Sequence, residues 1–226
     1  MLKEISVRGL AILGLVAILW CAELVVAYAD PAVLPANMWM DSRQIPLYDI
    51  YAFPPLASVA RPVTDPRFKI EELCQSKLPD ARVQHGFGGV SEHATINQST
   101  EDWSVQEQIV HYPGDTWTMG QAVNLIFSEL IGQIKGCADT SAGAQVDIST
   151  SMARCANITS GGCGWFAASV FIPESGVTAH VYLASAGNSL AELALWSRDI
   201  EVRWPHPADN SVLTALIAPL CPRGQC

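Results

Sequence analysis

The sequence predicts an α+β domain: a twisted antiparallel β-sheet of about five strands, with helices packed on one face and disulfides bracing the whole. Strand-like runs follow one another on short turn-like joins, and strands joined in this way must pair antiparallel. One long stretch has the apolar spacing of an amphipathic helix. An even set of cysteines follows an apolar N-terminal segment, as in exported proteins that form disulfides.

Residues 1–29 are interpreted as an export signal. A short basic start and a long apolar run precede Ala27-Tyr28-Ala29, the small-x-small pattern that a signal peptidase cleaves. Two alternatives remain: an uncleaved anchor over residues 9–29, about the 20 residues that cross a bilayer, and a lipoprotein acylated at Cys21. We expect an exported protein, whether secreted, periplasmic or on the cell surface, and membrane contact only through residues 9–29 if they are kept.

Residues 30–66 are rich in proline, and their apolar residues have no period. Proline fixes φ and removes a backbone donor, so we expect an extended arm that lies over the domain or acts as a tether. The exported α+β domain is expected over residues 67–226, with a short helix over 70–74 and a loop or bulged strand over 83–90.

A half-buried strand is expected over residues 103–112, where apolar and polar residues alternate. Pro113-Gly114-Asp115 then turns the chain, and a helix ends near Gly136. Its apolar stripe has spacings of three and four: Met119, Val123, Ile126, Leu130 and Ile134.

Four further strands are expected over residues 144–152, 165–172, 177–183 and 190–197. The joins between them are rich in Gly, Ser and Asn, which suits hairpins. A last amphipathic helix is expected over residues 208–220.

Composition describes a globular, acidic protein. The chain of 226 residues is 50% hydrophobic and 15% charged, with a net charge of −9. A mature chain of this length suits one domain. No run of Lys or Arg interleaves with aromatic residues, so nucleic acid is not an expected partner.

No catalytic motif is present: there is no Gly-x-Ser-x-Gly, no His-Glu-x-x-His and no phosphate-binding glycine loop followed by Lys. No cofactor is expected. His85 and His93 form a loose pair without the spacing of a zinc site, so no metal is expected either.

A polar sheet face is the candidate binding site. If the apolar side of each strand faces the helices, the opposite side presents a set of polar and aromatic residues that could line a groove: Asp147, His180, Tyr182, Glu192, Trp196 and Arg198. The alternative is an ordinary solvated face of a one-sided sheet.

The order of elements resembles the PknH-like extracellular sensor domain, an exported domain of mycobacteria and related actinobacteria. The resemblance rests on Val105–Pro113, the helix that follows as far as Cys137, and Cys163-Gly164-Trp165. It implies an α+β domain with a ligand-binding cleft and no established catalysis, and a bridge from Cys74 to Cys137. This chain lacks the family's further cysteine on a late strand, so a second bridge does not carry over.

The four remaining exported cysteines are expected to pair with their nearest partners in sequence, as Cys155 with Cys163 and Cys221 with Cys226. Six cysteines allow 15 connectivities.

We therefore expect an extracytoplasmic sensor-type domain that binds a small ligand or an envelope protein and is not an enzyme. One alternative is an exported hydrolase that uses His180 with Asp147 or Glu192 as acid and base. Another is an accessory subunit of an envelope complex that docks through the aromatic part of the arm, residues 39–53.

The mature protein is predicted to begin at Asp30, because Ala27 and Ala29 stand where the peptidase reads small residues. Intact-mass measurement of the exported protein checks this. A mass that retains residues 1–29 would favour the anchor, and an acylated N-terminus at Cys21 would favour the lipoprotein.

Overall fold

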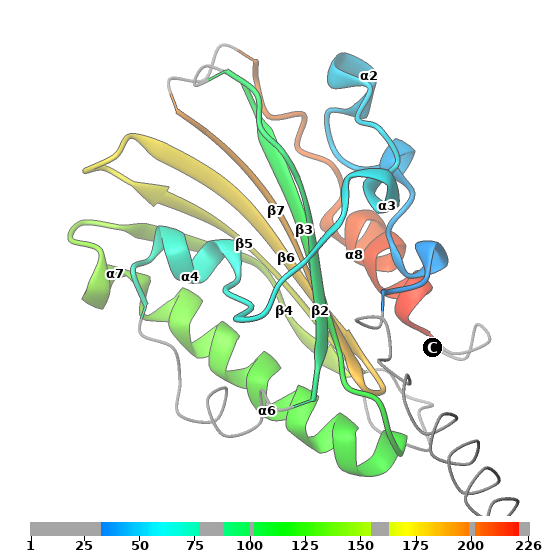
Figure 1. Cartoon of the computed structure of the whole chain (residues 1–226). Helices are drawn as coiled ribbons and strands as arrows, with labels where there is room; N and C mark the ends of the chain where they lie inside the picture. Colours follow the sequence, from blue (N-terminus) through cyan, green and yellow to red (C-terminus); the bar gives the residue numbers. More distant parts are fainter. Residues whose placement is uncertain (1–32, 77–87, 100–101, 155–162, 199–201, 222–226) are drawn as a thin grey trace, which may run out of the picture. The chain divides into compact units, whose positions relative to one another are not determined.

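The structure, a computed structural model, describes residues 33–76, 88–99, 102–154, 163–198 and 202–221 (Figure 1). The predicted export signal, Cys155 and Cys226 lie outside these residues. Among the helices of the described part, none is long and apolar enough to cross a membrane. That finding and the disulfides reported below are compatible with an exported protein.

Seven strands form one antiparallel sheet in the order β1-β2-β3-β7-β6-β5-β4. Their bounds are β1 Arg61–Pro62, β2 Val90–Ile96, β3 Ser104–His111, β4 Gln145–Arg154, β5 Cys163–Ile172, β6 Val177–Ala186 and β7 Ser189–Arg198. The α+β class and the antiparallel sheet are confirmed, but the expected number of about five strands was too low. The two missed strands are β1, which is only two residues long, and β2, whose apolar residues are interrupted by Ser, Glu, His and Thr.

The helices are mostly short apart from α6 and α8. Their bounds are η1 Ala36–Met38, η2 Ser42–Gln44, α2 Tyr48–Tyr51, α3 Leu56–Val59, α4 Lys69–Leu73, α6 Thr116–Lys135, α7 Cys137–Thr140, α8 Asp209–Ile217 and η3 Ala218–Leu220.

Helices cover both faces of the sheet, which corrects the expectation of one covered face. In Figure 1, α4 and α6 lie on one side of the strands, and α8 lies on the other with α2 and α3. The buried residues accordingly form two clusters: α6 side chains belong to one, and α8 side chains belong to the other together with the arm. We call these the α6 face and the α8 face. The central strands β6 and β7 are buried along most of their length because both of their sides are covered.

Helix α6 forms where the sequence predicts a helix. The Asp115 side chain caps it by accepting a hydrogen bond from the Thr118 backbone N–H at 2.8 Å. The predicted apolar stripe is buried from Val123 onward. The helix lies close to β5 because Gly164 has no side chain: a Cβ there would come within 2.6 Å of the Phe127 ring.

A disulfide joins Cys74 to Cys137, as the resemblance implies, with an S–S distance of 2.01 Å. The two cysteines are 63 positions apart, and the bridge fastens the end of α4 to the end of α6. Cys163 and Cys221 are also disulfide-bonded. The predicted pairs Cys155–Cys163 and Cys221–Cys226 each include a residue outside the described part of the chain.

The arm lies on the α8 face. Its apolar side chains are part of the same buried cluster as those of α8: Leu34, Trp39, Met40, Ile45, Leu47, Phe53 and Leu56. Two glutamate side chains of the sheet hold its backbone. Glu92 of β2 accepts a hydrogen bond from the Leu34 N–H at 3.1 Å, and Glu107 of β3 accepts one from the Met40 N–H at 3.2 Å.

Glu107 is fully buried, and burial raises its pKa to about 8 from the ordinary value of 4.5, against the opposing effect of the Met40 N–H. The side chain is therefore protonated at neutral pH. In an unfolded chain it would be ionised there, since desolvation is the cause of the shift.

The first prediction from this packing contrasts two leucines of α6. Leu130 is 1% exposed and Leu125 is 44% exposed. Leu130→Ala should lower the free energy of unfolding by roughly 2–5 kcal/mol, because it leaves a cavity in the core. Leu125→Ala, the matched control, should change it by less than about 1 kcal/mol. Urea denaturation of both variants measures this, and equal losses would contradict the assigned face of α6.

The second prediction concerns pH. Because the pKa of Glu107 is raised on folding, its stabilising effect is full below pH 4.5 and is lost as pH rises toward 8. The loss reaches about 1.4 kcal/mol per pH unit for one proton. Glu107→Gln keeps a neutral side chain of the same shape and should remove this slope. Urea denaturation of both proteins at pH 5 to 8 tests it, and identical slopes would show that Glu107 ionises normally.

Candidate functional site

The six residues predicted to share one polar sheet face are divided between the two faces. The strand register explains the division. His180 on β6 pairs with Leu195 on β7, so these two side chains point to the same face of the sheet. Side chains alternate along a strand, so Ala194 and Trp196 point to the face opposite His180. Asp147, His180 and Tyr182 lie on the α8 face, while Glu192, Trp196 and Arg198 lie on the α6 face. The expectation of one groove lined by all six is therefore wrong.

On the α8 face, His180 is packed among aromatic rings. Its ring stacks on Trp204 with centroids 3.7 Å apart and planes 6° apart, and Trp103 lies 5.5 Å away. The Ser169 hydroxyl is 2.8 Å from His180 Nδ1. Burial lowers the pKa of His180 to about 4, although the negative charge of Asp209 acts in the opposite direction. The imidazole is thus neutral at physiological pH and has low basicity.

Tyr182 is buried, and its hydroxyl donates a hydrogen bond to Asp209 at the start of α8, 3.0 Å away. Burial raises the pKa of this hydroxyl. Asp147 is exposed on β4 and pairs with Ser169, which in turn pairs with His180. Strand β5 thus lies between the Asp147 carboxylate and the His180 imidazole, which the hydrolase hypothesis pairs as acid and base.

On the α6 face, Glu192 holds a backbone segment. Its buried carboxylate accepts hydrogen bonds from the Lys69 N–H at 2.6 Å and from the Ile70 N–H at 3.1 Å, at the first turn of α4. The Lys69 ammonium lies 4.4 Å from the centre of the Trp196 ring and 2.9 Å from Glu72. Two residues of β7 therefore hold Lys69: Glu192 binds its backbone N–H, and Trp196 contacts its ammonium group.

A hollow of about 340 Å³ lies beside this lysine, and we call it the Trp196 hollow. Two of the six predicted residues, Trp196 and Arg198, line it. The other nine lining residues are Lys69, Leu73, Asn97, Gln98, Ser99, Asp102, Ser104, Val177 and Ser197. Its volume lies within the range of small-ligand sites, roughly 300 to 1,000 Å³.

Two cations and one carboxylate line the Trp196 hollow. Both oxygens of Asp102 are already engaged: the Tyr51 hydroxyl donates to one at 3.1 Å and the Ser99 hydroxyl to the other at 2.6 Å. The exposed Arg198 guanidinium has no hydrogen bond or ion pair with any residue that the structure describes. The hollow therefore offers an unpaired cation beside a lysine that is held in place.

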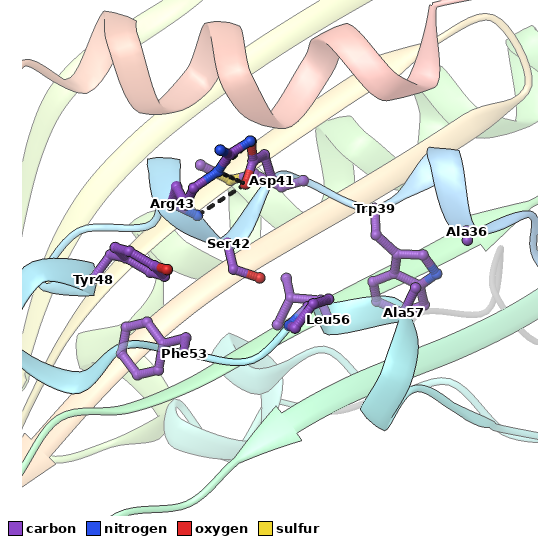
Figure 2. Close-up of a pocket in the computed structure, with 11 residues that line it drawn as sticks. Ala36, Trp39, Asp41, Ser42, Arg43, Tyr48, Phe53, Leu56 and Ala57 are labelled. Atoms are coloured by element: carbon purple, nitrogen blue, oxygen red, sulfur yellow. Dashed lines mark hydrogen bonds and ion pairs between the residues drawn. The ribbon is translucent and has the colours of Figure 1, made fainter.

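A second hollow, of about 380 Å³, lies within the arm. Figure 2 shows Tyr48 and Phe53 at one end of it, Trp39 at the other, and Arg43 joined to Asp41. That ion pair is 2.6 Å long and solvent-exposed. Because its two charges neutralise each other, this hollow presents no unpaired charge to a ligand.

Within the described residues, no group of three His, Cys, Asp or Glu side chains is close enough to hold a metal ion. His93 lies on β2, and His85 lies outside those residues.

Most of the Trp196 hollow was not anticipated from the sequence. Lys69, the segment from Asn97 to Ser99, and Asp102 are distant from β7 in the chain. The pairing of Ser104 with Trp196 brings the segment before β3 beside β7, and the hydrogen bonds to Glu192 bring Lys69 there. The polar run before β3 was the one available signal, and nothing local linked it to a binding site.

Comparison with known protein families, with characterised proteins and with solved structures found no match to this chain. Functional inference therefore depends on the geometry of the site.

Proposed function

We propose that this protein is an exported, non-catalytic domain of sensor type that binds a small organic anion in the Trp196 hollow. The observation that carries the proposal is the unpaired guanidinium of Arg198 next to Lys69. On a protein with a net charge of −9, this hollow contains Arg198 as an unpaired cation, whereas Lys69 is paired with Glu72 and the Asp102 carboxylate accepts two hydroxyl hydrogen bonds. Such a site favours a carboxylate or phosphate group.

The rest of the lining supports a polar ligand. Asn97 and Gln98 offer side-chain amides, and Ser99 and Ser104 offer hydroxyls. The N–H of Gln98 is already bonded to the Ser104 hydroxyl, which fixes that part of the wall. A small anion that also carries hydroxyl groups, such as a sugar acid, matches this chemistry.

The two alternatives have less support. For the hydrolase, the neutral His180 is stacked on Trp204 beside Trp103 and is not next to Asp147 or Glu192. For the accessory subunit, Trp39 and Phe53 are buried on the protein's own sheet and have little surface left for a partner. Export and the PknH-like resemblance remain part of the proposal, and the Cys74–Cys137 bridge is consistent with both.

Arg198→Gln tests the proposed site. With glucuronate as the probe in isothermal titration calorimetry, we expect the wild type to bind, and we expect the variant to bind at least tenfold more weakly. A lost charge-assisted hydrogen bond is worth about 1.5–3 kcal/mol, and tenfold corresponds to about 1.4 kcal/mol.

Arg61→Gln is the matched control, because Arg61 is an exposed arginine on β1 outside the hollow. It should bind like the wild type. Glucose tests the need for a negative charge, and inorganic phosphate tests whether the anion alone is enough. The proposal is wrong if neither glucuronate nor phosphate binds, or if the two arginine variants lose affinity equally.

A further inference from the structure

The arm reaches the Trp196 hollow through one side chain. Tyr51 belongs to α2 on the α8 face, yet its hydroxyl bonds to Asp102, which lines the hollow together with residues of the α6 face. The same hydroxyl accepts a hydrogen bond from the Trp103 backbone N–H at 3.3 Å. Tyr51 therefore holds the start of β3 by two contacts.

The segment that Tyr51 holds contributes to both faces of the sheet. Asp102 and Ser104 line the hollow, whereas the Trp103 side chain between them is fully buried on the α8 face. The Trp103 indole donates a hydrogen bond to the Val202 carbonyl at 2.8 Å. A shift of the arm that moves Tyr51 would consequently move the wall of the hollow.

Helix α2, which carries Tyr51, is held in a strained setting. Leu47 and Ala52, the residues on either side of it, have φ angles of 71° and 46°. Residues with a side chain rarely adopt this left-handed conformation, because it costs on the order of 1–3 kcal/mol. Contacts of α2 with the rest of the domain, including those of Tyr51, must offset that cost.

The Tyr51 hydroxyl also determines which groups the Asp102 carboxylate can pair with. With one oxygen bonded to Tyr51 and the other to Ser99, the carboxylate is satisfied without a cation. If the Tyr51 hydroxyl were absent, one oxygen of Asp102 would be released in a hollow that contains the unpaired Arg198. A carboxylate of the protein that pairs with this guanidinium would compete with an anionic ligand.

We propose that Tyr51 is a positioning residue of the Trp196 hollow: it withholds Asp102 from the unpaired Arg198 and so couples packing of the arm to anion binding. This inference rests on the proposed function. Because coupling between two sites is reciprocal, an anion bound in the hollow should also stabilise the arm.

The test compares Tyr51→Phe with Tyr48→Phe, again with glucuronate in titration calorimetry. Tyr48 is on the same helix and outside the Trp196 hollow, so its variant is the matched control. We expect Tyr51→Phe to weaken binding about three- to tenfold and Tyr48→Phe to leave it unchanged. In the double variant Tyr51→Phe/Asp102→Asn, the neutral amide cannot form an ion pair with Arg198, so affinity should return to within about twofold of the wild type.

Hydrogen exchange supplies a second measurement. Glucuronate should slow exchange of the Leu34 and Met40 amides, which donate to Glu92 and Glu107, in the wild type but not in Tyr51→Phe.

The outcomes separate the two proposals. If the wild type binds neither glucuronate nor phosphate, the proposed function is wrong and this inference falls with it. If the wild type binds and Tyr51→Phe binds equally well, only the inference is wrong. If Tyr51→Phe binds glucuronate weakly and the double variant does not restore affinity, the loss reflects a displaced lining of the hollow. The role assigned to Asp102 is then wrong.

Discussion

Three buried glutamates of the sheet strands accept backbone N–H groups from other segments of the chain, and the rest of the structure depends on this constraint. Glu92 and Glu107 hold the arm on the α8 face, and Glu192 holds the first turn of α4 on the α6 face. The Leu34, Met40, Lys69 and Ile70 N–H groups belong to no strand, so no neighbouring strand accepts a hydrogen bond from them. Leaving such a group unsatisfied costs about 1–3 kcal/mol, and the glutamate side chains remove that cost for all four groups.

The Trp196 hollow exists because these segments are docked. Glu192 and Trp196 lie four positions apart on β7 and point to the same side, so one strand binds both the backbone of Lys69 and its ammonium group. Asp102 is held from the other layer by Tyr51 of the arm. Strand β7 thus supplies Trp196 and Arg198, whereas the positions of Lys69 and Asp102 depend on two segments laid over the sheet.

The sequence predicted those helices and strands whose apolar residues recur with a regular period along the chain. The helix at α6, the strand β3, the last three strands of the sheet and the terminal helix were all predicted close to their observed bounds. The covering of the second face was missed for a physical reason. Part of its apolar cover comes from the arm, where prolines and short turns leave no period of 2 or 3.6 that would indicate burial.

The candidate site was predicted in part, and the errors have a common cause. Trp196 and Arg198 line the hollow, but Glu192 was interpreted as groove lining because strand alternation places it opposite the apolar side expected to face the helices. That interpretation assumes a strand with one solvent-exposed side. β7 is covered on both sides, and a carboxylate buried there must find hydrogen-bond donors, because burying it without them is very costly. In a doubly covered strand, such a residue indicates a chain segment that crosses above it, as α4 does here, rather than a ligand groove.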